Sequence, residues 1–194
     1  MRIVGGSRRG LRLAEVGAGD AAAHLRPTSE RVREAIFNLL LNGGYGNPVG
    51  GARVLDLFAG TGGLGLEALS RGAKSLTLID NGAVARRLLA RNIALMQEEA
   101  RASILARDAL QLGQNPGEVY DLIFLDPPYG KSLGEKALAE CRKGGWISDE
   151  ALIVWEENQP PEAPPWARLL DQRSYGGTVV SILSVDLNDR AGSR

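Results

Sequence analysis

The stretch DLFAGTGGLG, residues 56–65, decides the fold class because it joins a predicted strand, 53–58, to a predicted helix. Within it, Gly60, Gly62 and Gly65 satisfy the spacing G-x-G-x-x-G. Glycines in this position form a tight turn that brings backbone N–H groups and a helix N-terminus close to a ligand. The motif alone predicts a nucleotide-like ligand over the turn, and it fits NAD, FAD and S-adenosylmethionine equally.

Outward from this motif, apolar strands alternate with amphipathic helices. The predicted strands are 53–58, 75–79, 102–105, 121–125 and 152–155, and the predicted helices are 64–71, 83–97 and 133–142. Such alternation is typical of a parallel sheet that helices cover on both faces. Two further strands, 168–175 and 178–186, flank a Gly-Gly pair with no helix between them, which predicts an antiparallel hairpin at the sheet edge.

The N-terminal part of the chain precedes this alternating pattern. Segments 2–5 and 11–16 predict two short strands of a β-hairpin. A helix then begins near Thr28 or Ser29, either of which can cap its first turn.

These elements predict how the chain is organised. A glycine-rich loop, 42–51, separates the first helix from the first core strand. We expect a single domain over 1–194, with a hairpin and helix appendage in 1–50 and a Rossmann-like catalytic core in 51–190.

Three acidic residues lie at the edge where open α/β sheets bind their ligands. Asp56 lies in the glycine turn, where its carboxylate would repel a pyrophosphate but attract the sulfonium and ammonium groups of S-adenosylmethionine. Asp80 ends the second strand, where an acid can accept hydrogen bonds from both ribose hydroxyls or simply cap the next helix. Asp108 follows the third strand and suits either an adenine amino group or a helix cap.

The segment FLDPPYG, 124–130, ends the fourth strand at the same edge. The prolines stiffen the loop, so the Asp126 carboxylate and the Pro127 carbonyl form a rigid pair of acceptors. This pair suits a planar –NH₂ group, whose lone pair is delocalised into its ring until acceptors draw the nitrogen out of plane. Asp126 could also take the departing proton, and Tyr129 could stack on a base extruded from its helix. A stiff structural turn is the alternative interpretation.

Composition excludes several functional classes. The formal net charge is zero, although residues 1–33 hold seven arginines against three acidic residues, a pattern that suits phosphate contacts or a solvated basic face. A single cysteine, Cys141, and a single histidine, His24, argue against disulfides, clustered zinc ligands and a histidine-dependent triad. Without a signal peptide or membrane span in the sequence, we expect a cytoplasmic enzyme that uses no metal and binds no membrane.

The glycine motif together with DPPY resembles class I methyltransferases that act on amino groups. More specifically, the chain resembles the bacterial 16S rRNA (guanine(966)-N2)-methyltransferase family. The resemblance spans nearly the whole chain and rests on RIVGG (2–6), LRPTSERVREAIFNLL (25–40), VLDLFAGTGGLGLEALSRGA (54–73), LID (78–80), RDAL (107–110), DLIFLDPPYG (121–130) and YGGT (175–178). The RPT…RVRE…FN segment is its most family-specific part.

The resemblance implies a seven-stranded, mostly parallel sheet with an antiparallel C-terminal hairpin and helices on both faces. It implies that Asp56, Gly60 and Asp80 bind S-adenosylmethionine and that Asp108 lies near the adenine, and we expect further cofactor contacts from Gly62 and Ala109. The residues that it assigns to the guanine amine are Asp126, Pro127 and Tyr129. It also suggests that the N-terminal segment closes the cofactor pocket or contacts RNA, and the RNA contacts that we expect are Arg8, Arg9 and Arg26.

Other functions remain alternatives at this stage. A DNA adenine-N6 methyltransferase shares DPPY but usually needs a further target-reading domain, and a protein glutamine methyltransferase more often carries Asn at position 126. A dinucleotide-dependent oxidoreductase would explain the glycines but not DPPY, and an RNA-binding module would explain only the arginines. We expect 16S rRNA within an assembled or partly assembled small subunit as the substrate, and a monomeric enzyme.

Overall fold

A seven-stranded sheet forms the centre of the computed structural model, which describes residues 1–15 and 28–185. Its strands are β1 (Arg53–Leu57), β2 (Ser75–Ile79), β3 (Ala102–Leu105), β4 (Tyr120–Leu125), β5 (Ile147–Glu157), β6 (Ala167–Tyr175) and β7 (Thr178–Val185). They lie in the order β3-β2-β1-β4-β5-β7-β6. The pairs from β3 to β5 are parallel, while β7 is antiparallel to both β5 and β6. The predicted Rossmann-like fold with its antiparallel hairpin is confirmed.

The order of the strands reverses at β1, which has β2 on one side and β4 on the other. The chain leaves the β3 edge and returns to the far side of β1 to form β4. In open α/β sheets, this reversal opens a crevice beyond the carboxyl ends of the two strands. The glycine motif after β1 and the DPPY segment after β4 therefore meet at one place.

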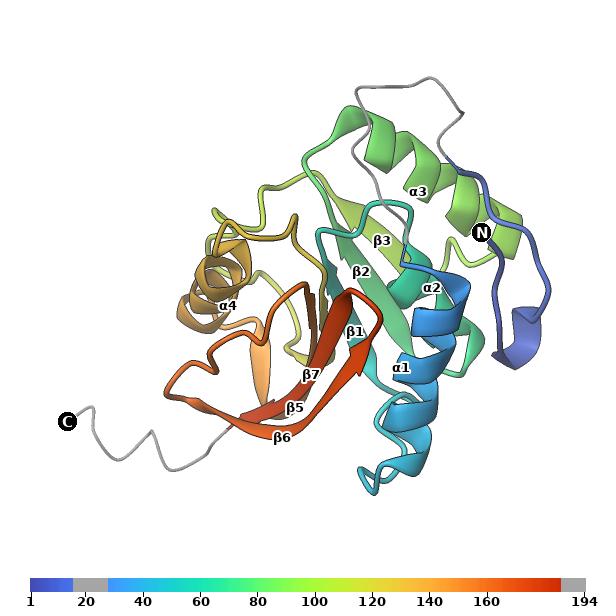
Figure 1. Cartoon of the computed structure of the whole chain (residues 1–194). Coiled ribbons are helices and arrows are strands. Elements are labelled where there is room, and N and C mark those ends of the chain that lie inside the picture. The colour runs from blue at the N-terminus through green and yellow to red at the C-terminus, as the bar shows by residue number, and fades with distance from the viewer. Residues whose placement is uncertain (16–27, 186–194) are drawn as a thin grey trace.

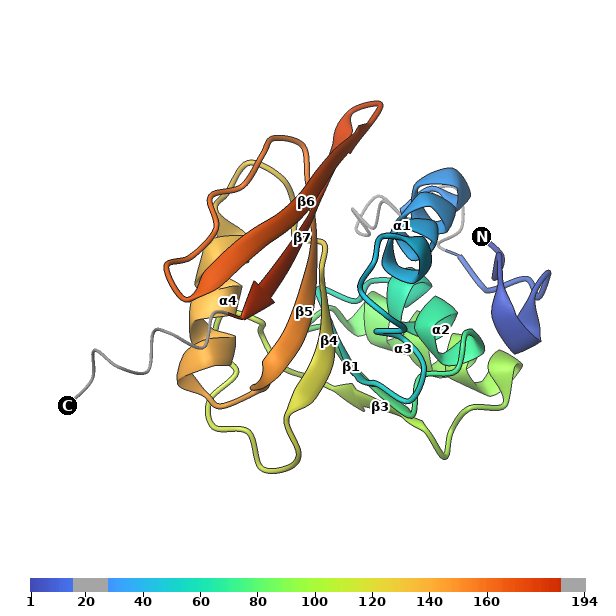
Figure 2. The same cartoon turned by 90° about the horizontal axis from the view of Figure 1, so that it is seen from below.

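Helices cover both faces of the sheet, as Figures 1 and 2 show. They are α1 (Glu30–Asn42), α2 (Gly63–Ser70), α3 (Ala83–Met96) and α4 (Leu133–Lys143). In Figure 2, α1, α2 and α3 lie on one face and α4 lies on the other. Neighbouring strand residues alternate between the two resulting cores: Val54 belongs to the first and Leu55 to the second. None of the helices within the described residues is long and apolar enough to cross a bilayer.

The N-terminal segment differs from the predicted hairpin. A single antiparallel bridge, Arg2 to Arg12, replaces the two expected strands, and a 3-10 turn, η1 (Gly6–Arg8), lies between them. This turn is bound to the end of α2, because Ser70 Oγ donates to the Gly5 carbonyl at 2.6 Å. Contacts with α2 therefore take the place of a regular strand ladder, and residue 16 lies outside the described residues.

The strand β5 is longer than the sequence predicted, and the residues that the prediction left out include an acid of the candidate site. The prediction placed a strand only over 152–155, because acidic residues on either side are rare in buried strands. The structure continues β5 through Glu156 and Glu157, which pair with β7 and are both buried. Backbone hydrogen bonds with β7 of the hairpin keep these two residues in the strand, although their local strand propensity is low.

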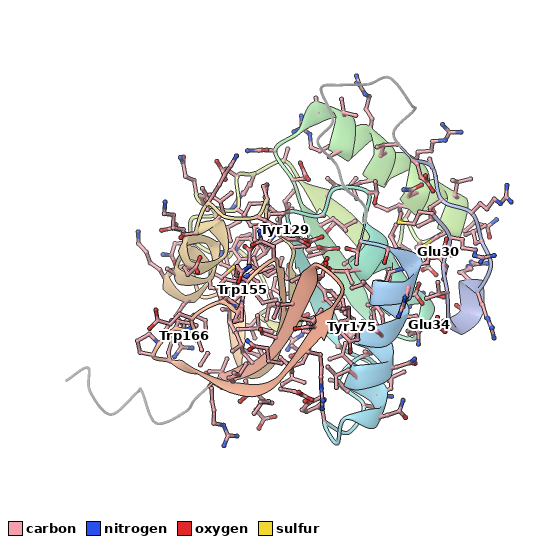
Figure 3. The ribbon with its side chains drawn as sticks, in the orientation of Figure 1. Glu30, Glu34, Tyr129, Trp155, Trp166 and Tyr175 are labelled. Carbon is pink, nitrogen blue, oxygen red and sulfur yellow. The ribbon has the colours of Figure 1, made fainter. Side chains whose placement is uncertain are left out.

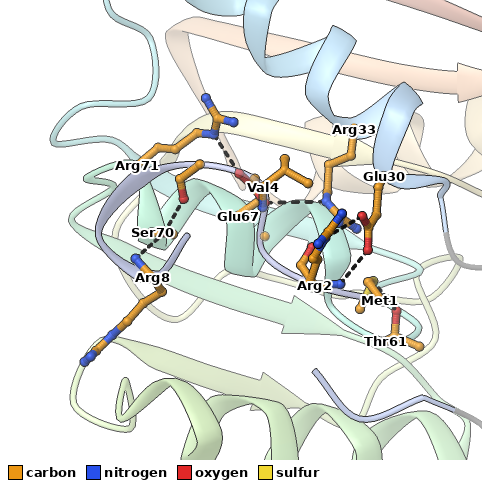
Figure 4. Close-up of polar contacts among 12 residues, drawn as sticks. Met1, Arg2, Val4, Arg8, Glu30, Arg33, Thr61, Glu67, Ser70 and Arg71 are labelled. Carbon is orange, nitrogen blue, oxygen red and sulfur yellow. Dashed lines mark hydrogen bonds and ion pairs between the residues drawn. The ribbon is translucent and has the colours of Figure 1, made fainter. Parts of the chain in front are cut away.

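The carboxylate of Glu67, on α2, joins the N-terminal segment and α1 to the core (Figure 4). Its Oε2 accepts the Val4 N–H at 2.9 Å and lies 3.5 Å from Arg33 Nε, while its Oε1 accepts from Arg71 Nε at 2.8 Å. Glu67 and Arg33 are both 0% exposed. Burial lowers the pKa of Arg33, whereas the Glu67 charge raises it.

We expect Glu67→Gln to lower the free energy of unfolding by about 3–5 kcal/mol, since it leaves a buried guanidinium without its anion. Urea unfolding measured at neutral pH would test this. The matched control is Glu140→Gln, which removes a half-exposed partner of Lys143 and should cost less than about 1 kcal/mol. Equal losses in the two variants would contradict a special role for the buried pair.

Candidate active site

The turn after β1 takes backbone conformations that favour glycine. Gly60 and Gly62 have positive φ angles of 55° and 81°. Phe58 also has a positive φ, 59°, although it carries a large side chain. Strain of this kind costs on the order of 1 kcal/mol or more and is common at functional sites. The loop therefore begins with a backbone that the surrounding fold has to hold in place.

Asp56 is almost completely enclosed beneath this turn, with 2% of its surface exposed. Its Oδ2 accepts the N–H of Gly65 at 2.9 Å, and a Cβ at Gly65 would lie only 2.9 Å from the same oxygen. Burial raises the pKa of Asp56 to about 7, with the Asp80 charge acting in the same direction and the Gly65 N–H opposing it. Dinucleotide-binding folds hold a pyrophosphate at the first turn of the helix that follows the glycine turn. Here a backbone N–H of that turn already donates to the Asp56 carboxylate.

Asp80 follows β2 and holds the glycine turn through its backbone. Its Oδ2 accepts from the Gly60 N–H at 2.9 Å and its Oδ1 from the Gly82 N–H at 2.7 Å. The side chain is half-buried, and each carboxylate oxygen keeps a further lone pair. Asp80 therefore lies directly after β2 and supports both the glycine turn and the start of α3, while ribose binding by Asp80 stays a prediction.

Asp108 lies beyond β3 at the same edge of the sheet. Its Oδ1 accepts from the Leu110 N–H at 2.9 Å, and Ala109 between them is buried. No helix follows within 109–119, so this contact is a short side-chain turn rather than the helix cap considered above. Adenine binding by Asp108 and Ala109 stays a prediction.

Asn92, on α3, is a functional candidate that the sequence analysis missed. It is completely buried; its Nδ2 donates to the Thr61 carbonyl at 2.9 Å, and its Oδ1 accepts from the Ala14 N–H at 2.7 Å. The amide therefore joins the glycine turn to the N-terminal segment. Its place gave a usable signal, since Asn92 lies three residues after Leu89 and four before Met96, on the apolar face of its helix.

The register of the sheet brings two acids together at the ends of β4 and β5. Leu125 pairs with Trp155, so the next residues, Asp126 and Glu156, lie side by side. Thr28 Oγ1 lies 3.1 Å from Asp126 Oδ2 and 3.3 Å from Glu156 Oε2. The sequence analysis proposed Thr28 or Ser29 as the helix cap; Ser29 is the cap, which leaves the Thr28 hydroxyl for this site.

Tyr129 joins the same cluster from the loop after β4. Its hydroxyl donates to Glu156 Oε1 at 3.0 Å, and its ring is half-buried (Figure 3). Burial raises the pKa of Tyr129, and the Glu156 charge adds to this. The phenol therefore stays protonated and serves as a donor, while stacking of its ring on a base stays a prediction.

The cluster has an excess of negative charge. Burial, followed by the Glu156 charge, holds the pKa of Asp126 well above its ordinary value, and Asp56 and Glu157 add to the shift. Burial likewise raises the pKa of Glu156, which is 4% exposed. Every charge named here is a carboxylate, so the site favours a cationic ligand.

Of the predicted RNA-binding arginines, Arg8 and Arg9 do not lie with these acids. The Arg8 N–H donates to Ser70 Oγ at 3.0 Å, at the end of α2 opposite the glycine turn, and exposed Arg9 follows it. An eight-residue helix separates this end from the turn by roughly 12 Å. Arg26 lies outside the described residues. RNA contacts by these three arginines stay predictions.

A surface hollow lies closer to the acids. It has a volume of about 330 Å³ between the start of α1 and the β6–β7 turn, and is lined by Ser29, Arg31, Val32, Tyr175 and Gly176. Figure 3 shows Tyr175 beside α1. Arg31 is exposed and forms no ion pair with the described residues. The hollow thus offers a guanidinium and an aromatic ring close to Thr28.

The doubly wound sheet, the acid-lined glycine turn and the DPPY loop together define the methyltransferase class of α/β proteins. A family model described as Conserved hypothetical protein 95 matches residues 1–184, and the chain belongs to this family of methyltransferases. The family resemblance found in the sequence is thereby confirmed.

Relatives and solved structures agree with this assignment. The chain is 37% identical over 167 residues to ribosomal RNA small subunit methyltransferase D of Escherichia coli K12, covering 84% of this chain and 79% of that protein. It is 32% identical over 188 residues to a putative rRNA methyltransferase of Bacillus subtilis, covering 94% and 97%. A solved putative methyltransferase from E. coli has a TM-score of 0.78 at 31% identity and covers 96% of this chain and 98% of that one.

We expect the elevated pKa of Asp56 to make the ligand-free protein less stable as pH rises. Below about pH 4 the Asp56 carboxyl is protonated in both the folded and the unfolded state. Its stabilising contribution is lost as pH rises through about 7, the pKa in the folded state. Asp56→Asn should abolish this loss, which is on the order of 4 kcal/mol. Urea unfolding of both proteins between about pH 4 and 8 would measure it.

The control for this experiment is Asp121→Asn. Hydrogen bonds from Arg53 lower the pKa of Asp121, so its contribution has the opposite sign and is lost as pH falls. Parallel pH profiles for the wild type and Asp56→Asn would refute the assignment to Asp56.

Proposed function

We propose that the protein transfers a methyl group from S-adenosylmethionine to the exocyclic N2 amine of a guanine in 16S rRNA of the small ribosomal subunit. The observation that carries the proposal is the position of Asp126 at the strand reversal, where β4 ends beside β1 and its glycine turn. A planar amine and a nucleotide-like methyl donor would meet there. The names of the relatives, which specify small-subunit rRNA, support the class of substrate.

The residues at the glycine turn fit S-adenosylmethionine. A dinucleotide would bring a pyrophosphate toward α2, where Asp56 already accepts from the N–H of Gly65. The methyl donor brings positive charge instead, and the carboxylates of Asp56 and Asp126 favour it. The tight approach of Gly65 to β2, where a Cβ would lie 2.6 Å from Leu76, is the close helix–strand packing that such turns require.

Individual residues would hold the cofactor in distinct ways. Asp80 would accept from the ribose hydroxyls through the lone pairs that Gly60 and Gly82 leave free. Asp108 and Ala109 would hold the adenine. When bound, the cofactor supplies an electrophilic methyl group on a positively charged sulfur.

The DPPY loop would prepare the target nitrogen. Asp126 and the Pro127 carbonyl accept hydrogen bonds from the –NH₂ group and expose its lone pair. The nitrogen would then take the methyl group as the cofactor's sulfur–carbon bond breaks, and Asp126 would accept the proton that the nitrogen releases. Tyr129 stacks on the extruded base. Positioning and electrostatics supply most of the effect.

The substrate would be a partly or fully assembled small subunit rather than free RNA. A chain with zero net charge has no overall attraction to RNA, so a particle that presents the base suits it better. Arg31 and Tyr175 would contact the nucleotide next to the target, with Arg8 and Arg9 reaching a more distant phosphate. We propose that the protein acts as a monomer and without a metal.

Transfer of a labelled methyl group from S-adenosylmethionine would test the function. The substrates would be unmodified 16S rRNA, small subunits that lack the modification, tRNA and DNA, and the labelled nucleoside would be identified after digestion. We expect N2-methylguanosine from the small subunits. N6-methyladenine from DNA would instead establish the adenine-N6 alternative, and an absence of label in every substrate would refute both.

We expect Asp126→Asn to lower the rate of single-turnover transfer at least about 100-fold, because an amide cannot accept the proton. The affinity for S-adenosylmethionine, measured by calorimetry, should change by less than about tenfold, because the substitution removes only one charge–charge contact with the cofactor. Glu99→Gln is the control, an exposed acid after α3 at the opposite edge of the sheet. Full activity of Asp126→Asn would exclude Asp126 as the proton acceptor.

A further inference from the structure

The Thr28 hydroxyl lies between two carboxylates that the proposed reaction does not use equally. It is 3.1 Å from Asp126 Oδ2 and 3.3 Å from Glu156 Oε2, and Tyr129 donates to the other oxygen of Glu156. Asp126 faces the proposed substrate, but Glu156 has so far no role. Its burial at the end of β5 requires a physical explanation, since an unpaired buried carboxylate is strongly destabilising.

A count of protons limits how this cluster can be arranged. A hydroxyl has one hydrogen, so Thr28 can donate to only one of the two carboxylates. The second contact becomes a hydrogen bond only when the other acid is protonated and donates to Thr28 Oγ1. A cluster with both acids ionised would leave one carboxylate facing an oxygen lone pair.

We propose that Glu156 is a positioning residue that keeps its proton and donates it in a hydrogen bond to Thr28, which in turn donates to an ionised Asp126. The chain of bonds runs from the Glu156 carboxyl through Oγ1 of Thr28 to Oδ2 of Asp126. This inference rests on the proposed function, in which Asp126 accepts the proton of the amine. It assigns to Glu156 and Thr28 the task of holding Asp126 in its ionised form and in a fixed orientation.

The surroundings of the two acids decide which of them holds the proton. Glu156 is 4% exposed, and its Oε1 already accepts from Tyr129, so Oε2 is left to carry the hydrogen toward Thr28. Asp126 is more exposed and borders the crevice. The other charges that act on Asp126 are those of Asp56 and Glu157. These charges and burial raise the pKa of Asp126, and burial raises the pKa of Glu156, so the pair retains a proton. The close enclosure of Glu156 and the contact of its Oε2 with Thr28 assign that proton to Glu156.

The arrangement keeps the protons of the proposed reaction in balance. As the nitrogen–carbon bond forms, the amine holds one proton too many, and this proton moves to the Asp126 carboxylate. Asp126 and Glu156 are then both neutral, and Asp126 returns its proton to water after the product leaves. If Asp126 held the shared proton from the start, it could not act as the acceptor.

Two pairs of variants test the proposal through activity. Glu156→Gln replaces the protonated acid with an amide that can donate to Thr28 and accept from Tyr129, so single-turnover transfer should stay within about threefold of wild type. Glu156→Ala, which can do neither, should lose about tenfold or more. Thr28→Val should lower the rate of single-turnover transfer by a similar factor, whereas Thr28→Ser, which keeps the hydroxyl, should have the rate of the wild type. A Glu156→Gln variant as impaired as Glu156→Ala would overturn the proposal, because an ionised Glu156 would then be required.

Infrared spectroscopy tests the proton itself, without cofactor or RNA. At about pH 8, above the pKa of about 7 of Asp56, the carbonyl band of a protonated carboxyl should be present in the wild type. It should disappear in Glu156→Gln and remain in Asp126→Asn. The reverse pattern would place the proton on Asp126 and refute the assignment. Since this measurement needs no methyl transfer, it distinguishes failure of the assignment from failure of the proposed function.

Discussion

The buried carboxylate of Glu67 is the interaction on which the arrangement of the N-terminal half depends. It accepts from the backbone of Val4 and pairs with Arg33 and Arg71, so three segments distant in sequence converge on one side chain. Since Arg33 belongs to the second turn of α1, this contact also determines where the first turn of α1 lies on the sheet. Thr28, two residues before the helix, reaches the ends of β4 and β5 as a result. A buried charge pair that contacts neither proposed catalytic acid thereby contributes to the geometry of both.

The strand reversal at β1 imposes the second constraint, a concentration of acids at one edge. Asp80 directly follows β2 and Asp126 directly follows β4, while Asp56 and Glu156 are the second-last residues of β1 and β5. They lie near one another because parallel strands in register end close together. Four carboxylates in so small a region would repel one another unless some are protonated or a cation lies among them. A sulfonium meets this requirement and a neutral thioether does not. The same electrostatics that favour binding of the proposed cofactor would therefore weaken binding of its product after the methyl group has left.

Most of the fold could be predicted from local pattern, whereas the site could be predicted only in part. The glycine turn, the DPPY loop and the alternation of strands and helices depend on residues close in sequence, and all appear where the sequence indicated. Glu156 was missed because two successive acids resemble the end of a strand, and only pairing with β7 shows that β5 continues. Thr28 was considered as a helix cap, since its contact with Asp126 spans 98 residues and leaves no local signal. Arg8 and Arg9 were predicted to contact RNA from their charge and from the family resemblance, and local sequence could not show that the chain carries them to the far end of α2.

The same acids connect stability with ligand binding. In the ligand-free protein, burial opposes the ionised form of Asp56, so the folded state binds this proton more strongly than the unfolded chain does. A cation in the crevice favours the ionised form and lowers this pKa, which means that its binding must release a proton and strengthen as pH rises. Stability of the complex then depends on the concentration of the cation as well as on pH. A site whose burial opposes ionisation until the cofactor binds would carry its full negative charge only when the methyl donor is present.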